Sequence, residues 1–423
     1  MSPETPEPID PWQPILTGNL AREACAAVRA ISDALYPEPA PRPGIASGEA
    51  GLALFWAYLA RAGGGREHEE TALRFVERSI DAVADQWLPA NLYGGYPGIA
   101  WLVEHLQGTL LSAEDGEDPN EEIEESLYEH LAGVPCEGEY DLILGLTGLG
   151  VFALERLPRP RAADCLERIV LHLEAASEER PEGIAWRTPR ERQWAELRDL
   201  LPEGGYNLGV GHGAPGVVAL LAGACAAGVA AERARPLLDG AVAWILAQRL
   251  EDRSRSVFPD VVGPGCPPRP ARLAWCYGDA GIAAVLHAAG RAVGEPAWQR
   301  EALAIAVEAA ARPLIAARVG DACLCHGSAG LGHLFNRLYQ RSGDLRLRDA
   351  AVLWFRHALA QRQDGAGVAG YLYQAHDEEG GGRRPVPERG FLTGAAGIGL
   401  ALLAAVAPVE PAWDRLLLAS VRA

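Results

Sequence analysis

The sequence predicts an all-α protein whose helices form an α/α toroid, a barrel of two concentric helical rings. A Gly-x-x-Gly signature recurs seven times, a mostly apolar helical run follows each signature, and a more amphipathic run precedes most of them. A helix that is apolar on most sides belongs inside a protein, whereas an amphipathic helix belongs outside. Seven outer–inner helix pairs in sequence therefore predict an outer ring around an inner one.

The signatures mark the start of each predicted inner helix. Their first glycines lie 47 to 68 residues apart, the size of a helical hairpin with inserted loops. Glycine allows backbones to crowd together, and a helix N-terminus presents free N–H groups. We therefore expect the turns to meet at one end of the barrel, around a shared cavity. The seven first glycines are Gly48, Gly95, Gly145, Gly213, Gly278, Gly327 and Gly394.

Apolar and amphipathic runs predict the residue ranges of the inner and outer helices. An open helical solenoid would show similar helix pairs, but solenoid repeats vary less in their spacing. The closed toroid is favoured because the chemically reactive residues gather at the glycine turns. The predicted inner helices include residues 52–60, 217–227 and 398–406, and the predicted outer helices include 73–87, 163–176, 231–248, 298–315 and 345–361.

Segments outside this pattern are predicted to be mainly loops. Residues 1–15 form a Pro-rich tail, and residues 16–423 form a single α/α-toroid domain. The acidic run around residues 114–125 is expected to be a solvated loop. Residues 184–192 alternate as a strand does, which predicts a small hairpin, and residues 254–270 form a long loop before the fifth signature.

Composition excludes several functions. The chain of 423 residues has a formal net charge of −18, so a nucleic-acid partner is not expected. All 38 basic residues are arginine, which excludes a lysine Schiff base or a P-loop lysine. No apolar stretch approaches the roughly 18 residues of a membrane span, and no secretory signal is present. We expect a cytoplasmic protein without direct membrane insertion.

Cysteine and histidine stand directly before two of the signatures. Cys276 and Tyr277 precede the fifth, and Cys325 and His326 precede the sixth. If the same turn recurs around a ring, these side chains lie on adjacent turns and could converge. Two thiolates and one imidazole suit zinc and leave a fourth position for water or substrate. From the residues alone, buried thiols with a hydrogen-bonded histidine remain an alternative.

Two more candidates stand before the third and fourth signatures. His212 directly precedes Gly213, and Asp141 lies just before Gly145. A histidine between glycines is accessible and can donate or accept protons near neutral pH. The alternative is that both residues only cap helices. The other cysteines are expected to be bystanders or buried thiols, including Cys323, which makes a Cys-x-Cys with Cys325.

These motifs together resemble the lanthionine synthetase C-like (LanC-like) family. The resemblance rests on Trp-Cys-Tyr-Gly ending at Gly278, on Cys-His-Gly ending at Gly327, on His-Gly ending at Gly213 and on the seven turns. It implies an α/α toroid with one catalytic zinc per chain. Cys276, Cys325 and His326 fall on the family's ligand positions, and His212, Asp141 and Arg272 fall on its acid/base and orienting positions.

The implied activity is that of a stand-alone, class I type lanthipeptide cyclase. Such an enzyme adds peptide cysteine thiols to dehydroalanine or dehydrobutyrine in a dehydrated precursor peptide. A separate dehydratase must make that substrate, so a transient complex with one is expected, and the chain itself is expected to be a monomer. Three other functions remain open: addition of glutathione to dehydroamino acids, zinc-dependent prenyl transfer, and non-catalytic binding of a peptide as a scaffold.

Overall fold

The computed structural model describes residues 11–36, 40, 42–112, 118–132, 139–193, 195–376 and 382–421. Its chain divides into two compact units. Unit 1 comprises Met1–Pro89, Gly94–Glu117 and Arg318–Trp413, and unit 2 comprises Ala90–Tyr93, Asp118–Ala317 and Asp414–Ala423. The expectation of a single domain over residues 16–423 stays a prediction.

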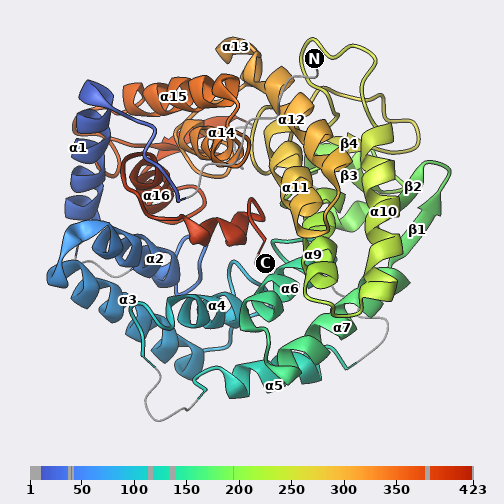
Figure 1. The fold of residues 1–423 in the computed structure, drawn as a ribbon, viewed down its shortest axis with the longest axis horizontal. Coiled ribbons are helices and arrows are strands. Elements are labelled where there is room, and N and C mark those ends of the chain that lie inside the picture. Colours follow the sequence, from blue (N-terminus) through green and yellow to red (C-terminus); the bar gives the residue numbers. More distant parts are fainter. Residues whose placement is uncertain are drawn as a thin grey trace. The chain divides into compact units, whose positions relative to one another are not determined.

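Unit 1 contains four helices that follow glycine signatures and are almost wholly buried: α2, α4, α14 and α16. Among them α16 packs against both α14 and α2, and α2 packs against α4 (Figure 1). Three amphipathic helices, α1, α3 and α15, lie outside them. The elements are α1 (Gly18–Leu35), α2 (Glu49–Leu59), the π-helix η1 (Ala60–Gly64), α3 (Arg66–Asp85), α4 (Tyr96–Leu106), α14 (Ser328–Ser342), α15 (Leu345–Ala360), β5 (Tyr373–His376), β6 (Arg383–Val386) and α16 (Ala395–Val406).

Unit 2 contains the other three buried inner helices, α6, α9 and α11, with α9 packed between α6 and α11. The amphipathic helices α5, α7, α10 and α12 lie outside them. The elements are α5 (Glu121–His130), α6 (Leu146–Arg156), α7 (Pro160–Ala175), β1 (Ser177–Arg180), β2 (Gly183–Thr188), the 3₁₀ helix η2 (Arg190–Arg192), α8 (Ala195–Arg198), β3 (Gly205–Asn207), α9 (Ala214–Ala226), α10 (Ala231–Ala247), β4 (Val261–Val262), α11 (Asp279–Ala292), α12 (Pro296–Ala310) and α13 (Leu314–Ala317). The chain passes from unit 1 to unit 2 within the 3₁₀ helix η3 (Ala412–Leu417).

The glycine signatures begin the inner helices, as predicted. Each first glycine is the N-cap of its helix. The second glycine is required because the preceding loop folds back against it. A Cβ at Gly330 would lie 1.8 Å from the Leu324 carbonyl oxygen, and one at Gly397 would lie 1.8 Å from that of Phe391. Any side chain at these two positions would displace the turn.

The helix pairs follow a consistent order. Five inner helices pack against the outer helix that follows them in sequence, as α2 does with α3 and α14 with α15, whereas α4 packs against α3. The last inner helix, α16, packs instead against the first outer helix, α1. The end of the predicted tail joins this pair, because the buried Trp12 donates its indole N–H to the Ala404 carbonyl at 2.8 Å.

The strands form two small antiparallel sheets. In unit 2 the order is β1-β2-β3-β4, and in unit 1 β5 pairs with β6. The strand predicted in residues 184–192 is present as β2, but these residues do not form a hairpin by themselves. The strand ends at Thr188, residues 190–192 form η2, and β2 pairs with β1 on one side and β3 on the other. The long loop at residues 254–270 contributes β4 to the same sheet.

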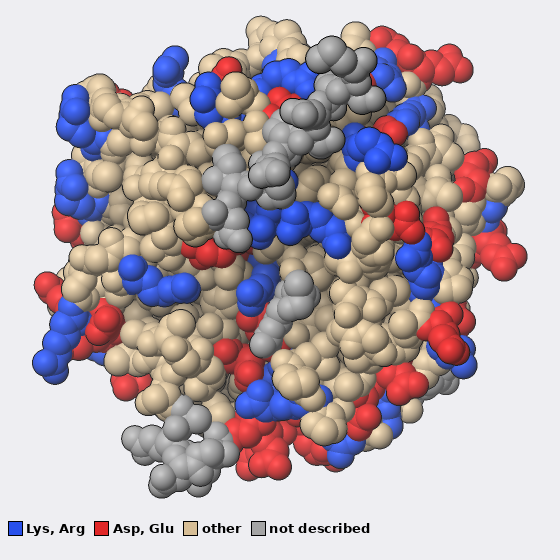
Figure 2. Space-filling view, viewed as in Figure 1, with Lys and Arg blue, Asp and Glu red and all other residues tan. Residues whose placement is uncertain are grey.

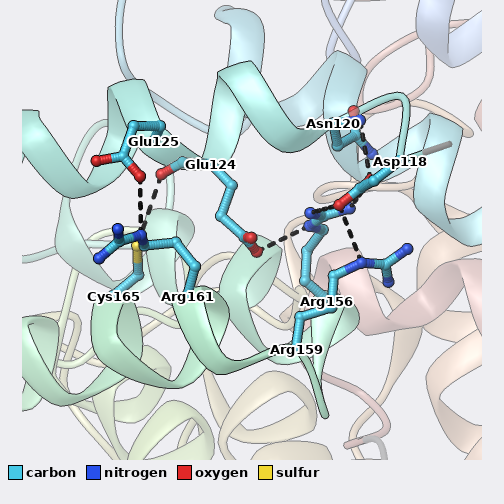
Figure 3. Close-up of polar contacts among 8 residues, drawn as sticks. All are labelled: Asp118, Asn120, Glu124, Glu125, Arg156, Arg159, Arg161 and Cys165. Atoms are coloured by element: carbon cyan, nitrogen blue, oxygen red, sulfur yellow. Dashed lines mark hydrogen bonds and ion pairs between the residues drawn. The ribbon is translucent and has the colours of Figure 1, made fainter.

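The acidic run around residues 114–125 is not simply a loop. Residues 113–117 lie outside the described part, but α5 begins at Glu121 and buries Glu124. The reason is Arg156 on α6, whose side chain is fully buried. Its guanidinium donates to Glu124 at 2.9 Å and to Asp118 at 2.6 Å, which fixes the start of α5 against α6 (Figure 3).

Most other charged side chains are on the surface. On the face drawn in Figure 2, acidic and arginine side chains are interspersed. Exposed pairs such as Arg66–Glu70 stabilise a protein by only about 0–1 kcal/mol, so they contribute little to the fold. No helix among the described residues is both long enough and apolar enough to cross a membrane.

Candidate functional site

The third and fourth glycine turns are joined by their backbones in unit 2. The N–H groups of Leu142 and Ile143 donate to the Gly211 carbonyl at 3.2 and 3.3 Å. This pairing sets the residues before Gly145 beside those before Gly213. Two side chains that stand 71 residues apart in sequence, Asp141 and His212, therefore meet.

Asp141 and His212 form a tightly held pair. The Nδ1 of His212 lies 2.6 Å from Oδ2 of Asp141, whose Oδ1 accepts the N–H of Leu144 at 2.7 Å. A carboxylate oxygen accepts hydrogen bonds, so the Nδ1–H of His212 donates to Asp141, and this bond fixes the orientation of the ring. The Asp141 side chain is 7% exposed and that of His212 is 21% exposed, so only the histidine reaches solvent to any extent.

Tyr140 stabilises the position of this pair through its hydroxyl group. Its hydroxyl hydrogen-bonds to Thr188 Oγ1 at 3.0 Å and donates to the His212 carbonyl at 3.3 Å. Burial raises the pKa of Tyr140 well above its ordinary value, so the hydroxyl stays protonated. The preceding residue, Glu139, pairs with Arg192 at 3.1 Å. Burial raises the pKa of the Glu139 carboxyl, although Arg192 opposes the shift.

A cavity of about 260 Å³ opens onto the His212–Asp141 pair. Its volume is close to the lower end of the range for small-molecule sites. Charged and polar side chains supply much of its wall, including the Glu139–Arg192 pair. The lining residues are Glu139, Tyr140, Asp141, Leu144, Thr188, Arg192, Gln193, Arg198, Asn207 and His212.

Cys276 lies beside the fourth turn. A Cβ at Gly209 would lie 2.4 Å from the Cys276 carbonyl oxygen, and one at Gly211 would lie 3.8 Å from the Cys276 Cβ. The Cys276 side chain is half-buried. The following residue, Tyr277, is held by Asn207, whose Nδ2 donates to its hydroxyl at 2.8 Å. The predicted residues Asp141, His212 and Cys276 thus belong to one region of unit 2.

Arg272 lies in the loop before α11 and is half-buried. Its carbonyl oxygen lies 1.9 Å from where a Cβ would stand at Gly278, which has a positive φ of 105°. Among the described residues, no hydrogen bond or ion pair joins its guanidinium to Asp141 or His212. The role of Arg272 stays a prediction.

Cys325 and His326 lie in unit 1, on the sixth turn. The Cys325 N–H donates to the Leu392 carbonyl at 2.9 Å, which ties the sixth turn to the seventh as the third is tied to the fourth. Within the described part of the chain, the buried Nε2 of His326 has no hydrogen-bond partner. The His326 ring contacts Tyr373 of β5, with 5.8 Å between ring centroids. A buried nitrogen without a partner is suited to a metal ion.

Sequence reasoning missed several residues of this region. Arg192, Gln193 and Arg198 come from the segment after β2, and Asn207 ends β3. Asn207 carried a usable signal, since it stands six residues before Gly213, where Asp321 stands before Gly327. The arginines carried none, because their place in the wall depends on pairing between strands far apart in sequence.

Comparison with known proteins identifies the family. The sequence matches the family described as lanthionine synthetase C-like protein over residues 41–418. The chain belongs to this family. The LanC-like chain is also 25% identical over 313 residues to the nisin biosynthesis protein NisC of Lactococcus lactis subsp. lactis, a match that covers 70% of this chain and 74% of NisC.

A solved structure has a fold similar to that of this chain. The structure of a nisin cyclase matches this LanC-like chain with a TM-score of 0.71 at 21% identity, covering 95% of this chain and 98% of the cyclase. At that identity the similarity establishes the fold. The predicted fold class, an α/α toroid built from helix pairs with Gly-x-x-Gly turns, is confirmed.

Proposed function

We propose that this LanC-like chain is a zinc-dependent lanthionine cyclase. It would join peptide cysteine thiols to dehydroalanine or dehydrobutyrine in a dehydrated precursor peptide, forming thioether rings in lanthipeptide biosynthesis. The observation that carries the proposal is the His212–Asp141 pair at 2.6 Å, on the wall of a cavity and in the same region as Cys276. Membership of the family and similarity to a nisin cyclase support it.

Cys276, Cys325 and His326 are the residues we assign to one zinc per chain. Cys276 and Cys325 occupy the same position in two turns, two residues before the first glycine. The unpartnered Nε2 of His326 fits a ligand role, and two thiolates with one imidazole are a set that zinc prefers. When bound, zinc with one open position would supply a deprotonated, nucleophilic substrate thiol.

His212 is the proposed acid/base group. In the reaction, the thiolate sulfur bonds to the β-carbon and the alkene electrons move onto the carbonyl oxygen. The enolate then collapses and takes up a proton at the α-carbon, so no group is lost and the mass of the peptide is unchanged. With Nδ1 held by Asp141, the Nε2 of His212 can deliver that proton or accept the one from the incoming thiol.

Arg272 has a separate proposed role. In the described part of the chain, no hydrogen bond or ion pair joins its guanidinium to Asp141. We therefore propose that the guanidinium stabilises the enolate oxygen. A positive group aimed at developing negative charge lowers the barrier of the addition step. The cavity would contribute by holding alkene and thiol in reacting geometry.

The substrate and cellular setting are part of the proposal. The chain would act in the cytoplasm as a monomer, on a peptide already dehydrated by a separate dehydratase with which it associates transiently. Glutathione in place of the peptide thiol is the alternative that uses the same residues, and it needs the same alkene.

The test uses a peptide that contains one dehydroalanine and one cysteine. Since cyclisation leaves the mass unchanged, an alkylating reagent added after the reaction counts the thiols that remain. We expect loss of the thiol with wild-type protein and with Cys266→Ala, a matched buried cysteine, but not with Cys325→Ala. A second arm offers glutathione and a cysteine-free dehydroalanine peptide. Faster consumption of glutathione than of the peptide thiol, or no reaction in either arm, would overturn the cyclase proposal.

A further inference from the structure

Asp321 of unit 1 is a buried carboxylate with an unusual environment. The residue is 4% exposed. Its Oδ1 accepts the N–H of Cys323 at 3.1 Å, and its Oδ2 accepts the N–H of Gln374 at 3.1 Å. Within the described residues, no arginine or histidine forms an ion pair with it. A buried charge that only neutral donors compensate is costly, which makes the site receptive to a cation.

Five other buried carboxylates of the chain each have an arginine or histidine as a partner. Arg312, for example, pairs with the fully buried Asp279. Asp321 therefore differs from these five carboxylates. The paired carboxylates are Glu49, Glu124, Asp141, Glu155 and Asp279.

Two groups that bind metals stand next to Asp321. One potential ligand atom each from Asp321, Cys323 and His326 all lie within 4.8 Å of one another. Cys323 is 1% exposed, and its Sγ accepts the backbone N–H of His326 at 3.4 Å. That bond fixes the position of the sulfur beside His326. The Nε2 of His326, as described above, has no hydrogen-bond partner.

We propose that Asp321, Cys323 and His326 form a second metal position, contained wholly within unit 1. Carboxylate, thiolate and imidazole suit a borderline-soft divalent cation such as zinc. Binding would replace the thiol proton of Cys323 by the metal and release that proton to solvent. The carboxylate and thiolate together would neutralise the cation, so no further counter-ion is required. Cys323 is then a ligand and not the bystander expected from the sequence.

The geometry requires only a small adjustment. Ligand atoms around tetrahedral zinc lie about 3.3–3.8 Å apart, given bonds of about 2.0–2.3 Å. Closing the present set needs a movement of about 1 Å by the side chains. Each Asp321 oxygen keeps a lone pair beside its backbone hydrogen bond, so metal binding does not have to break the loop.

The second position shares His326 with the set proposed for catalysis. Because we assign the Nε2 of His326 to both positions, the two are alternatives and the chain holds one metal at a time. Unit 1 could then capture a cation without any residue of unit 2. The inference does not depend on the cyclase activity, because it concerns binding alone.

The test removes the other thiols and asks whether metal still binds. In the full-length Cys276→Ala/Cys325→Ala variant, cobalt(II) is titrated as a spectroscopic probe of zinc sites. We expect one cobalt per chain with a thiolate-to-cobalt charge-transfer band, and competition by zinc. Adding Cys323→Ala abolishes the band, whereas adding Cys266→Ala, a matched buried cysteine of unit 2, leaves it unchanged.

Further variants keep the result interpretable. Asp321→Asn in the same background is expected to weaken cobalt binding by more than about tenfold. Circular dichroism and thermal unfolding in chelator establish that each variant is folded. Absence of cobalt binding by the folded Cys276→Ala/Cys325→Ala variant overturns the proposal, and so does a band that survives Cys323→Ala. A wild-type chain that binds zinc but does not cyclise would defeat only the proposed function.

Discussion

His212 and His326 occupy the same position in two glycine turns, directly before the first glycine, but their surroundings differ. In unit 2 the Nδ1 of His212 is held by Asp141 at 2.6 Å, and the ring faces a cavity. In unit 1 the Nε2 of His326 is buried and has no hydrogen-bond partner among the described residues. The proposed roles follow this difference, proton transfer for His212 and metal binding for His326.

The two histidines share a position in their turns, so the difference between them comes from the residues that surround each ring. The carboxylate for His212 comes from the third turn, joined to the fourth through the Gly211 carbonyl. The residues around His326 are its own neighbours in sequence, Cys323 and Cys325, together with Tyr373 of β5. Burial, with help from the nearby acidic groups, raises the pKa of Tyr373 to about 12, so this ring stays neutral beside the histidine.

The largest expected effect comes from removing the His212 imidazole. We expect His212→Ala to lower the rate of ring formation about 10²–10⁴-fold, the usual contribution of general acid–base catalysis. The measurement is the rate of thiol loss from the dehydroalanine peptide. The matched control is His172→Ala, a buried histidine whose ring bonds the Leu131 carbonyl at 3.1 Å and does not line the cavity. Equal losses for both variants would contradict the assignment.

Asp141 should act only through His212. Asp141→Asn preserves the shape of the side chain but removes the charge that fixes Nδ1–H. Residues that act as a unit give non-additive effects, so adding Asp141→Asn to His212→Ala should cause little further loss. Independent, multiplicative losses in the double variant would show that Asp141 has a role of its own.

A third prediction concerns the stability of unit 2 and changes neither histidine. Arg156→Met leaves Glu124 buried without its partner, so we expect the free energy of unfolding to fall by about 3–5 kcal/mol. Chemical denaturation measures this, with the exposed Arg66→Met as the control that should change by less than about 0.5 kcal/mol. A loss no larger than in the control would show that α5 does not need this ion pair.

A second ion pair of Arg156, with Asp118, gives a pH dependence. The hydrogen bond from Arg156 lowers the pKa of Asp118 from 3.8 to about 2. A lowered pKa contributes stability that is fully present above about pH 4 and is lost as the pH falls towards 2. The stability difference between wild type and Asp118→Asn should therefore shrink over that interval. A difference that stays constant down to pH 2 would rule out this linkage.

The smallest effect concerns the turns themselves. An added Cβ at Gly330 meets the Leu324 carbonyl oxygen at 1.8 Å, whereas one at Gly216 meets that of Val210 at 2.6 Å. We expect Gly330→Ala to destabilise the protein by about 1–3 kcal/mol and Gly216→Ala to cost less. Thermal unfolding of both variants measures the difference. The reverse order would mean that the turn of His326 adapts more easily than that of His212.

The helical fold was largely predictable because its signal is local. Each Gly-x-x-Gly turn is fixed by a close contact with the loop directly before it, as at Gly330 and Gly397. Each inner helix is buried on nearly every side, so its apolar run is visible in sequence. The pairing of Asp141 with His212 could be anticipated for the same reason, since both stand at the same end of neighbouring repeats.

The rest depends on contacts between distant residues. Helix α5 looked like an acidic loop because its buried Glu124 relies on Arg156, 32 residues away. The cavity wall depends on the register of β2 with β3, which places Arg192 near Glu139. The position of Asp321 before Gly327 is visible in the sequence, but its burial without a counter-ion becomes evident only from its surroundings.

The most direct test of the account is the zinc content of two variants, His326→Ala and His212→Ala, measured beside wild type by elemental analysis. The account predicts about one zinc per chain in wild type and in His212→Ala, and essentially none in His326→Ala, because both proposed metal positions use His326. Full zinc in His326→Ala, or equal losses in the two variants, would contradict the division of roles between these histidines.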